Sequence, residues 1–252
     1  FASRGKGMTK ELLGYPMGSF GEVFEVLANR VREMGGQVHL SAAVDRVTVE
    51  DGVATGLEVT LGDGESSAEN FDAVLATTPS FIFPKLVPPM PDDYARRLSG
   101  VTYMAAVLII LELDRPLTDV YWLNVADRPI PFVGVIEHTN MIDPSLYGGK
   151  HIVYLANYLS IDSPLYAMSH EELLTEYLPH LRKVNPDFED SWVQTSHHHK
   201  VGAAQPIIGT NYSQRIPSHR TPFEGVYLAN TTQIYPEDRG TNYSVRMGRH
   251  VA

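Results

Sequence analysis

The chain has 252 residues, of which 43% are hydrophobic and 20% charged, so its composition is that of a globular protein with a sizeable core and not of a disordered one. A formal net charge of −10 disfavours nucleic acid as a partner, because such binding needs a clustered basic surface. The absence of cysteine excludes disulfides, thiolate metal sites and a cysteine nucleophile, and it fits a reducing compartment, which we take as the cytoplasm.

The N-terminal residues 1–8 lack the apolar stretch of a signal peptide, and the most apolar run, 101–113, is shorter than the about 20 residues that a bilayer requires. We therefore expect no transmembrane segment and interpret 101–113 as a strand buried on both faces. The chain starts at Phe1, stops inside a helical pattern and lacks a Gly-x-Gly-x-x-Gly sequence after a strand, so we expect it to be part of a longer protein.

The first predicted element is a helix that begins at a capping box formed by Ser19 and Glu22, followed by apolar residues at helical spacing. Gly35 and Gly36 are expected to end this helix in left-handed conformations. Three short strands in meander order should follow, with a turn at Asp51 and Gly52, then a polar loop and one more buried strand. Their expected ranges are 37–40, 43–49, 53–61 and 71–79.

The central part of the chain is predicted to form strands, interrupted by one helix with a clear start signal. A second capping box, Ser169 and Glu172, starts that helix. This separation of strands from helices predicts an α+β layer. The expected strands are 103–113, 121–125, 132–137, 152–158 and 192–199.

The C-terminal part contains a short apolar strand, 226–229, a loop with Pro236 and Gly240, and a helix that begins near Thr241. A strand that leads to a helix N-terminus suits an anionic or carbonyl-bearing cofactor, because free N–H groups and the positive end of the helix dipole face the ligand.

This C-terminal segment resembles the flavin-contacting motif of the superfamily of FAD-dependent amine oxidases, protoporphyrinogen oxidases and phytoene desaturases. In that superfamily a strand ends in Leu-Ala-Gly-Asp and the following helix lies under the flavin. Here Tyr227-Leu228-Ala229 matches, while Asn230 and Thr231 replace the Gly-Asp whose aspartate binds the ribityl or phosphate part of the cofactor. The resemblance implies that Thr231 donates one hydrogen bond, and that the cofactor contacts come from Asn230, Thr231, Gly240, Thr241, Asn242 and Tyr243.

The N-terminal block is similar to the same superfamily, in which a Tyr-Pro-x-Gly-Gly turn, a helix, a Gly-Gly pair, a meander and a strand ending Ala-Thr-x-Pro follow one another. By this resemblance Gly18 lies in the glycine turn and Val44 lies near the adenine of the cofactor. An ordinary helix and meander without a ligand is the alternative for this block.

The resemblance implies an α+β or α/β fold: part of an FAD-binding domain (1–83 and 219–252) and an inserted α+β substrate-binding domain (84–218) with a mixed, largely antiparallel sheet. It implies an FAD-dependent oxidoreductase that dehydrogenates a small organic substrate by hydride transfer to flavin N5. FAD would then be held by the full-length parent, and the isolated fragment would be inactive. The oligomeric state is not predicted.

The strand 103–113 matches the place where amine oxidases carry a lysine, yet no lysine occurs between Lys85 and Lys150. This favours a desaturase-like or protoporphyrinogen-oxidase-like dehydrogenation over amine oxidation. Two alternatives stay open. One is a flavoenzyme similar to UDP-galactopyranose mutase, which acts on a sugar nucleotide and needs a basic diphosphate clamp. The other is a non-catalytic binding domain.

The catalytic candidates are Tyr235, His197 and His199, and the substrate candidates are Arg239 and Tyr235. On a strand, His197 and His199 share one face, where His219 or His151 would complete a metal site. We expect no metal, because no carboxylate accompanies the histidines at a fixed spacing. Two further arginines, 246 and 249, are expected to interact with the C-terminal end of the helix dipole.

Overall fold

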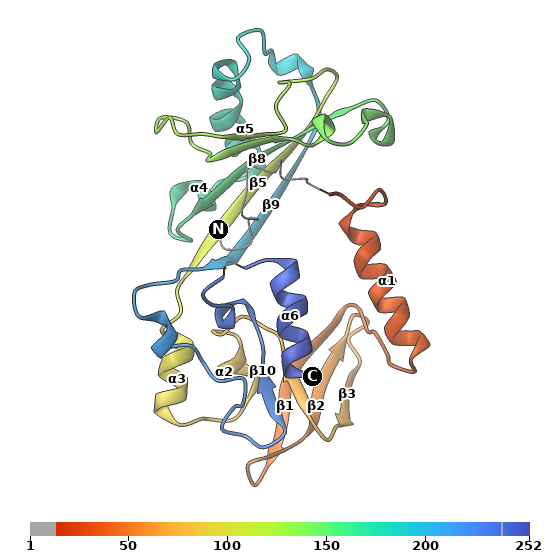
Figure 1. Cartoon of the computed structure of the whole chain (residues 1–252), viewed down its shortest axis with the longest axis vertical. Helices are drawn as coiled ribbons and strands as arrows, with labels where there is room; N and C mark the ends of the chain where they lie inside the picture. The colour runs from red at the N-terminus through yellow and green to blue at the C-terminus, as the bar shows by residue number, and fades with distance from the viewer. Residues whose placement is uncertain (1–13, 238) are drawn as a thin grey trace, which may run out of the picture. The chain divides into compact units, whose positions relative to one another are not determined.

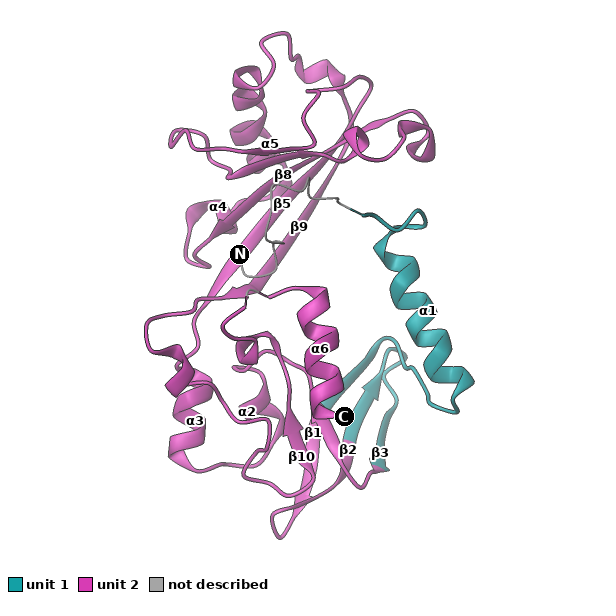
Figure 2. Cartoon of the chain, viewed as in Figure 1, with its two compact units in different colours: residues 1–45, 58–69 teal, residues 46–57, 70–252 magenta. Residues whose placement is uncertain are grey.

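The computed structural model describes residues 14–237 and 239–252 (Figure 1), so the prediction that concerns residues 1–8 lies outside the described residues. The chain divides into two compact units (Figure 2). One contains residues 1–45 and 58–69, and the other contains residues 46–57 and 70–252. The domain boundaries inferred from the sequence are a different division and stay a prediction. Within the described ranges, no helix has both the length and the apolar character needed to cross a bilayer.

Helix α1 (Ser19–Glu33) follows Gly18 as its N-cap, and the predicted capping box is not formed. Ser19 has a left-handed backbone, with φ of 77°, and its hydroxyl accepts a hydrogen bond from the Gly21 N–H at 3.2 Å instead of from Glu22. At the other end Gly35 is left-handed as predicted, with φ of 87°, whereas Gly36 is not. No residue of α1 is buried.

Strands β1 (Ala42–Glu50), β2 (Val53–Leu61) and β3 (Ser66–Asn70) form a sheet in the order β1-β2-β3. The meander order is confirmed, but its members differ, because 37–40 is not a strand and 66–70 is. A tight turn explains the difference: the Gly64 N–H bonds to the Leu61 carbonyl and the Leu61 N–H to the Glu65 carbonyl. Backbone pairing therefore makes β3 a strand although all its side chains are exposed.

The unit of residues 46–57 and 70–252 contains a parallel pair of short strands, β4 (Val74–Ala76) and β10 (Val226–Leu228). The predicted strand 71–79 is shortened at its end because Pro79 starts a turn, in which its carbonyl accepts the N–H of Ile82. Helices α2 (Phe83–Leu86) and α3 (Asp92–Ser99) follow. One hydrophobic core is made by Val47, Ala54, Ala76, Phe83, Val87, Tyr94, Leu98, Val226 and Leu228.

A five-stranded sheet has the order β6-β7-β8-β5-β9, and its strand pairs are antiparallel. The predicted largely antiparallel sheet in an α+β fold is thus confirmed, with parallel pairing between β4 and β10. The strand bounds are β5 Tyr103–Leu113, β6 Trp122–Asn124, β7 Gly134–Glu137, β8 His151–Leu159 and β9 Val193–Pro206.

Strand β5 is buried on one face only, which corrects the expectation of burial on both. Ala105, Val107, Ile109 and Leu111 are fully buried, and the residues between them are partly exposed. The buried face packs in a second core with Leu173 and the ring of Tyr177.

Helix α4 (Pro164–Ala167) precedes α5 (His170–Tyr177), and α6 (Thr241–Val251) ends the chain as predicted. The capping box of α5 is confirmed: the Glu172 N–H donates to Ser169 Oγ at 3.3 Å, and the Ser169 N–H donates to Glu172 Oε2 at 2.7 Å. Short 3-10 turns lie at His138–Asn140, Pro144–Tyr147, Leu178–Lys183, Asp190–Trp192, Tyr212–Gln214 and Thr231–Gln233.

Candidate functional site

A cavity of about 400 Å³ lies where β4 and β10 end. Its size is that of small-molecule sites, and its wall is mainly apolar with a few polar groups, as such sites usually are. We call it the strand-end cavity. It is lined by Leu75, Thr77, Pro79, Tyr103, Ala203, Ala204, Ala229, Asn230, Thr231, Ser244, Met247, Gly248 and Val251.

Asn230, a predicted cofactor residue, is buried, and its hydrogen bonds stabilise the wall of the strand-end cavity. Its Nδ2 donates to the Thr78 carbonyl at 2.9 Å and to Ser80 Oγ at 3.2 Å. Its Oδ1 accepts from the Thr232 N–H at 3.0 Å and from Thr232 Oγ1 at 2.6 Å. These four bonds use the full capacity of the amide. Asn230 therefore positions the end of β10.

Thr231 lines the cavity, and its side chain makes no hydrogen bond to another described residue. By the resemblance given in the sequence analysis, Thr231 replaces the aspartate of the superfamily motif. A second unused hydroxyl lies on the neighbouring strand end: Thr78 Oγ1 is buried without a partner among the described residues, between Thr77 and Pro79, which line the cavity. The strand ends thus supply hydroxyl groups whose bonding capacity the described fold does not use.

Helix α6 presents one face to the strand-end cavity through Ser244, Met247, Gly248 and Val251. A Cβ added at Gly248 would meet no atom within 4 Å, so the glycine leaves room that a side chain would fill. This face was not predicted from the sequence, which indicated the N-terminus of the helix instead. The i, i+3, i+4, i+7 spacing of these four residues was the available signal.

The predicted residues at the start of α6 lie elsewhere. Thr241 and Asn242 are exposed, and Gly240 is the N-cap with an extended backbone. Tyr243 lines a second cavity, of about 280 Å³. The cofactor contacts of these residues stay predictions.

The second cavity also contains Tyr235, His219, Arg246 and His250. Arg246 forms an ion pair with Glu237 at 2.7 Å and lies 4.9 Å from the ring centre of Tyr243. This corrects the interpretation that Arg246 serves the end of the helix dipole, because its side chain reaches back toward the loop. Hydrogen bonding to Arg246 lowers the pKa of Glu237, which keeps the carboxylate ionised.

Arg239, predicted to bind substrate, is held by the five-stranded sheet. Its Nη2 donates to the Tyr158 hydroxyl at 3.1 Å and to Gln205 Oε1 at 2.9 Å. The guanidinium also lies 5.7 Å from the ring centre of Tyr158. These contacts fix the loop before α6 to β8 and β9, and the substrate contact stays a prediction.

His197 and His199 pair with neighbouring β5 residues of one face, as expected, and both are exposed. His197 Nε2 lies 3.0 Å from Glu112 Oε1. His198 belongs to the opposite face, where its ring centre lies 5.8 Å from that of His170. None of the three described cavities is lined by His197 or His199, so the structure does not bring them together with Tyr235.

The other two histidines of the hypothetical metal site have their own neighbours. His219 Nδ1 contacts the Leu228 carbonyl at 3.0 Å, and His151 lies beside Glu137. Over residues 14–237 and 239–252, no group of three or more His, Cys, Asp or Glu residues is arranged to hold a metal ion.

Gly18 and Val44 belong to the unit of residues 1–45 and 58–69. Val44 is exposed, and Gly18 is the N-cap of α1. Their contacts with a cofactor stay predictions.

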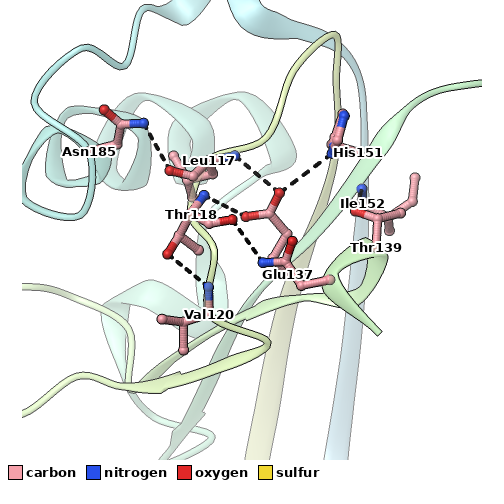
Figure 3. Close-up of polar contacts among 9 residues, drawn as sticks. Leu117, Thr118, Val120, Glu137, Thr139, His151, Ile152 and Asn185 are labelled. Atoms are coloured by element: carbon pink, nitrogen blue, oxygen red, sulfur yellow. Dashed lines mark hydrogen bonds and ion pairs between the residues drawn. The ribbon is translucent and has the colours of Figure 1, made fainter. Parts of the chain in front are cut away.

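A buried carboxylate that the sequence analysis missed lies on β7 (Figure 3). The Glu137 side chain is fully buried and accepts the N–H groups of Leu117, at 3.1 Å, and Thr118, at 2.6 Å. Burial raises the pKa of Glu137, although the two backbone bonds oppose that shift. His151 Nδ1 is 3.7 Å away, and burial lowers the pKa of this histidine, so the contact is not an ion pair at neutral pH. Glu137 thus anchors the loop after β5.

The comparisons with known proteins agree with this architecture. The family model described as flavin containing amine oxidoreductase matches residues 7–237. A sequence search of curated proteins finds no match.

Three solved structures resemble the fold. An oxidoreductase from Methanosarcina mazei has a TM-score of 0.64 at 21% identity, over 84% of this chain and 49% of that one. A candidate protoporphyrinogen oxidase from Exiguobacterium sp. 255-15 has a TM-score of 0.61 at 17% identity, and the match covers 82% of this chain and 46% of that protein. A reduced UDP-galactopyranose mutase has a TM-score of 0.62 at 14% identity, and the match covers 80% of this chain and 42% of that protein. The chain therefore spans about half the length of these proteins.

Proposed function

Because this chain belongs to the family of flavin containing amine oxidoreductases, we propose that it supplies part of an FAD-dependent oxidoreductase and that the strand-end cavity receives part of the flavin. The observation that carries the proposal is the convergence of the ends of β4 and β10 with one face of α6 on a mainly apolar cavity. A flat ring system fits such a wall, and the hydroxyl groups offer contacts for its polar edge.

The residues of the cavity would bind and orient the cofactor. Thr231 and Ser244 would donate hydrogen bonds to polar atoms, and Gly248 would allow the ring to approach the helix. Met247 and Val251 would exclude water, which strengthens the polar contacts. When bound, the flavin supplies the hydride acceptor, and the chain supplies orientation and polarity.

We propose dehydrogenation of a small organic substrate with a largely apolar contact surface. Strand β5 carries no lysine, and its Tyr103 lines the strand-end cavity. Tyr235 lies in the adjacent cavity and is the side chain that we propose for substrate contact together with Arg239. A cytoplasmic location is part of the same proposal.

The cavity is tested by titrating the N-terminally extended form of the chain, described below, with FAD and following flavin fluorescence. Gly248→Leu fills the cavity and should weaken FAD binding by about tenfold or more. Val245→Leu is the matched control, because Val245 is exposed on α6 and does not line the cavity. Equal affinity of the two variants would refute the assignment of the cavity.

The activity of the whole enzyme is tested separately. We propose that stable retention of FAD also needs protein regions that correspond to the unmatched half of the solved structures. The measurement is bound-flavin absorption after desalting, for this chain and for a longer form extended N-terminally to the start of its gene. Retention by the longer form alone is the expected result. Retention by neither form would favour a non-catalytic binding domain.

A further inference from the structure

A cavity of about 310 Å³ away from the strand-end cavity is lined by three arginines. Arg96 and Arg97 come from the last turn of α3, and Arg215 follows the 3-10 turn Tyr212–Gln214. The wall of this cavity also contains one carboxylate and two apolar or aromatic side chains, from Asp93, Val101 and Tyr212. We call it the arginine cavity.

The charges of the arginine cavity are not balanced within the described part of the chain. Asp92 and Asp93 precede Arg96 and Arg97 by four residues, a spacing that permits helical ion pairs, yet neither pair is formed. Arg215 donates to the Thr210 carbonyl at 2.9 Å, which leaves its charge uncompensated. Three guanidinium groups therefore face one carboxylate.

The position of two arginines in the last turn of α3 has an ordinary explanation, because cations there interact favourably with the helix dipole. That explanation does not cover Arg215, which comes from a different segment and lines the same cavity. The protein as a whole carries a net charge of −10, so its overall field repels anions and any anion affinity must arise locally.

The remaining wall is apolar and fixed. Tyr212 is 4% exposed, and its hydroxyl donates to the Thr232 carbonyl at 2.7 Å, so the ring cannot turn away. Val101 is buried beside it. The cavity also exceeds the size of a bare phosphate ion, which leaves room for a ligand body next to the charged end.

We propose that the arginine cavity binds a small phosphomonoester with an apolar or aromatic body. A phosphomonoester carries up to two negative charges on three terminal oxygens, which suits three planar guanidinium donors better than a carboxylate with two oxygens. The ring or chain of the ligand would lie against Tyr212 and Val101. This site does not depend on the flavin proposal.

The test is a calorimetric titration of the chain at low ionic strength with phenyl phosphate as the probe. Phenyl phosphate should bind more tightly than inorganic phosphate, and phenol should show no binding. The double variant Arg96→Ala/Arg97→Ala should weaken phenyl phosphate binding by about tenfold or more, since hydrogen bonds to charged groups are lost. Arg215→Ala should weaken it as well.

The matched control is Arg128→Ala/Arg249→Ala, which removes the same formal charge from exposed residues outside the arginine cavity. Its affinity should stay within about twofold of the parent chain, with thermal melting confirming that all variants are folded. The proposal is overturned if the two double variants lose affinity equally, because binding would then follow net charge, or if phenyl phosphate does not bind at all.

Discussion

Replacing Glu137 by alanine should destabilise the protein strongly, although the residue lies outside every described cavity. Its carboxylate is the acceptor for the N–H groups of Leu117 and Thr118. The carbonyls of the same two residues are held by the side-chain amides of Asn185, at 2.9 Å, and Asn140, at 2.8 Å. The loop after β5 therefore depends on one carboxylate as the acceptor for two of its N–H groups.

The magnitude follows from these contacts. Each N–H left buried without a partner costs about 1–3 kcal/mol, and the removed methylene groups leave space inside a packed region. Against these losses, the variant no longer has to desolvate a charge, which reduces the net effect. We expect a loss of about 3 kcal/mol in the free energy of unfolding, which lowers Tm by roughly 6–12 °C for a domain of this size.

The assay is urea unfolding followed by tryptophan fluorescence, with calorimetric Tm as a second readout. Glu176→Ala is the matched control, because Glu176 is exposed on α5 and its loss should change stability by no more than about 0.5 kcal/mol. The loss of stability in Glu137→Gln should lie between those of Glu137→Ala and Glu176→Ala. The amide keeps one acceptor oxygen but turns its NH₂ donor toward a backbone N–H group. A loss below about 1 kcal/mol in Glu137→Ala would show that the loop finds other acceptors and would refute this reasoning.

Three further predictions concern stability. Asn230→Ala removes four hydrogen bonds, three of them buried, and should lower the free energy of unfolding in urea by about 2–4 kcal/mol. An effect under about 1 kcal/mol would contradict the positioning role of Asn230. Gly225→Ala should lower the free energy of unfolding more than Gly149→Ala does. Both glycines have a left-handed backbone, but an added Cβ would lie 3.1 Å from the Asp72 carbonyl oxygen at Gly225 and would meet no atom within 4 Å at Gly149. Equal losses of stability would contradict this steric argument. Because burial lowers the pKa of His151, the folded state binds fewer protons than the unfolded state, so this histidine's contribution is complete above pH 6.5 and is lost as pH falls toward its folded pKa. The wild-type protein should therefore lose more stability than His151→Gln between about pH 7 and pH 5. If the free energies of unfolding of the two proteins changed in parallel with pH, His151 would not be the source of this pH dependence.

Local signals in the sequence were sufficient for elements that local chemistry stabilises. The capping box of Ser169 and Glu172 places the start of α5 correctly, because both of its hydrogen bonds join residues three positions apart. The similar pattern at Ser19 gave a wrong cap, since the left-handed backbone of Ser19 directs its hydroxyl to Gly21. A capping pattern thus depends on a backbone conformation that the residue types do not specify.

For the candidate site, two of the residues selected from the sequence line the strand-end cavity, and their cofactor contacts stay a prediction. Asn230 and Thr231 line the strand-end cavity, as expected for residues at the end of β10. The side of α6 that faces this cavity was not predicted, because it depends on how the helix packs against strands from distant parts of the chain. The arginine cavity has the same origin, since Arg215 joins Arg96 and Arg97 only after folding.

By itself the sequence determined the α+β class and the terminal strand and helix, because these follow from hydrophobic periodicity. The family and the antiparallel character of the central sheet were implied by the resemblance of short motifs to a known superfamily. Only the tertiary structure decided which side chains converge. Glu137 meets the N–H groups of a loop twenty residues away, Arg239 meets β8 and β9, and a face of α6 meets two strand ends. The physical reason is that burial and hydrogen bonding between distant segments depend on long-range packing, which no local pattern encodes.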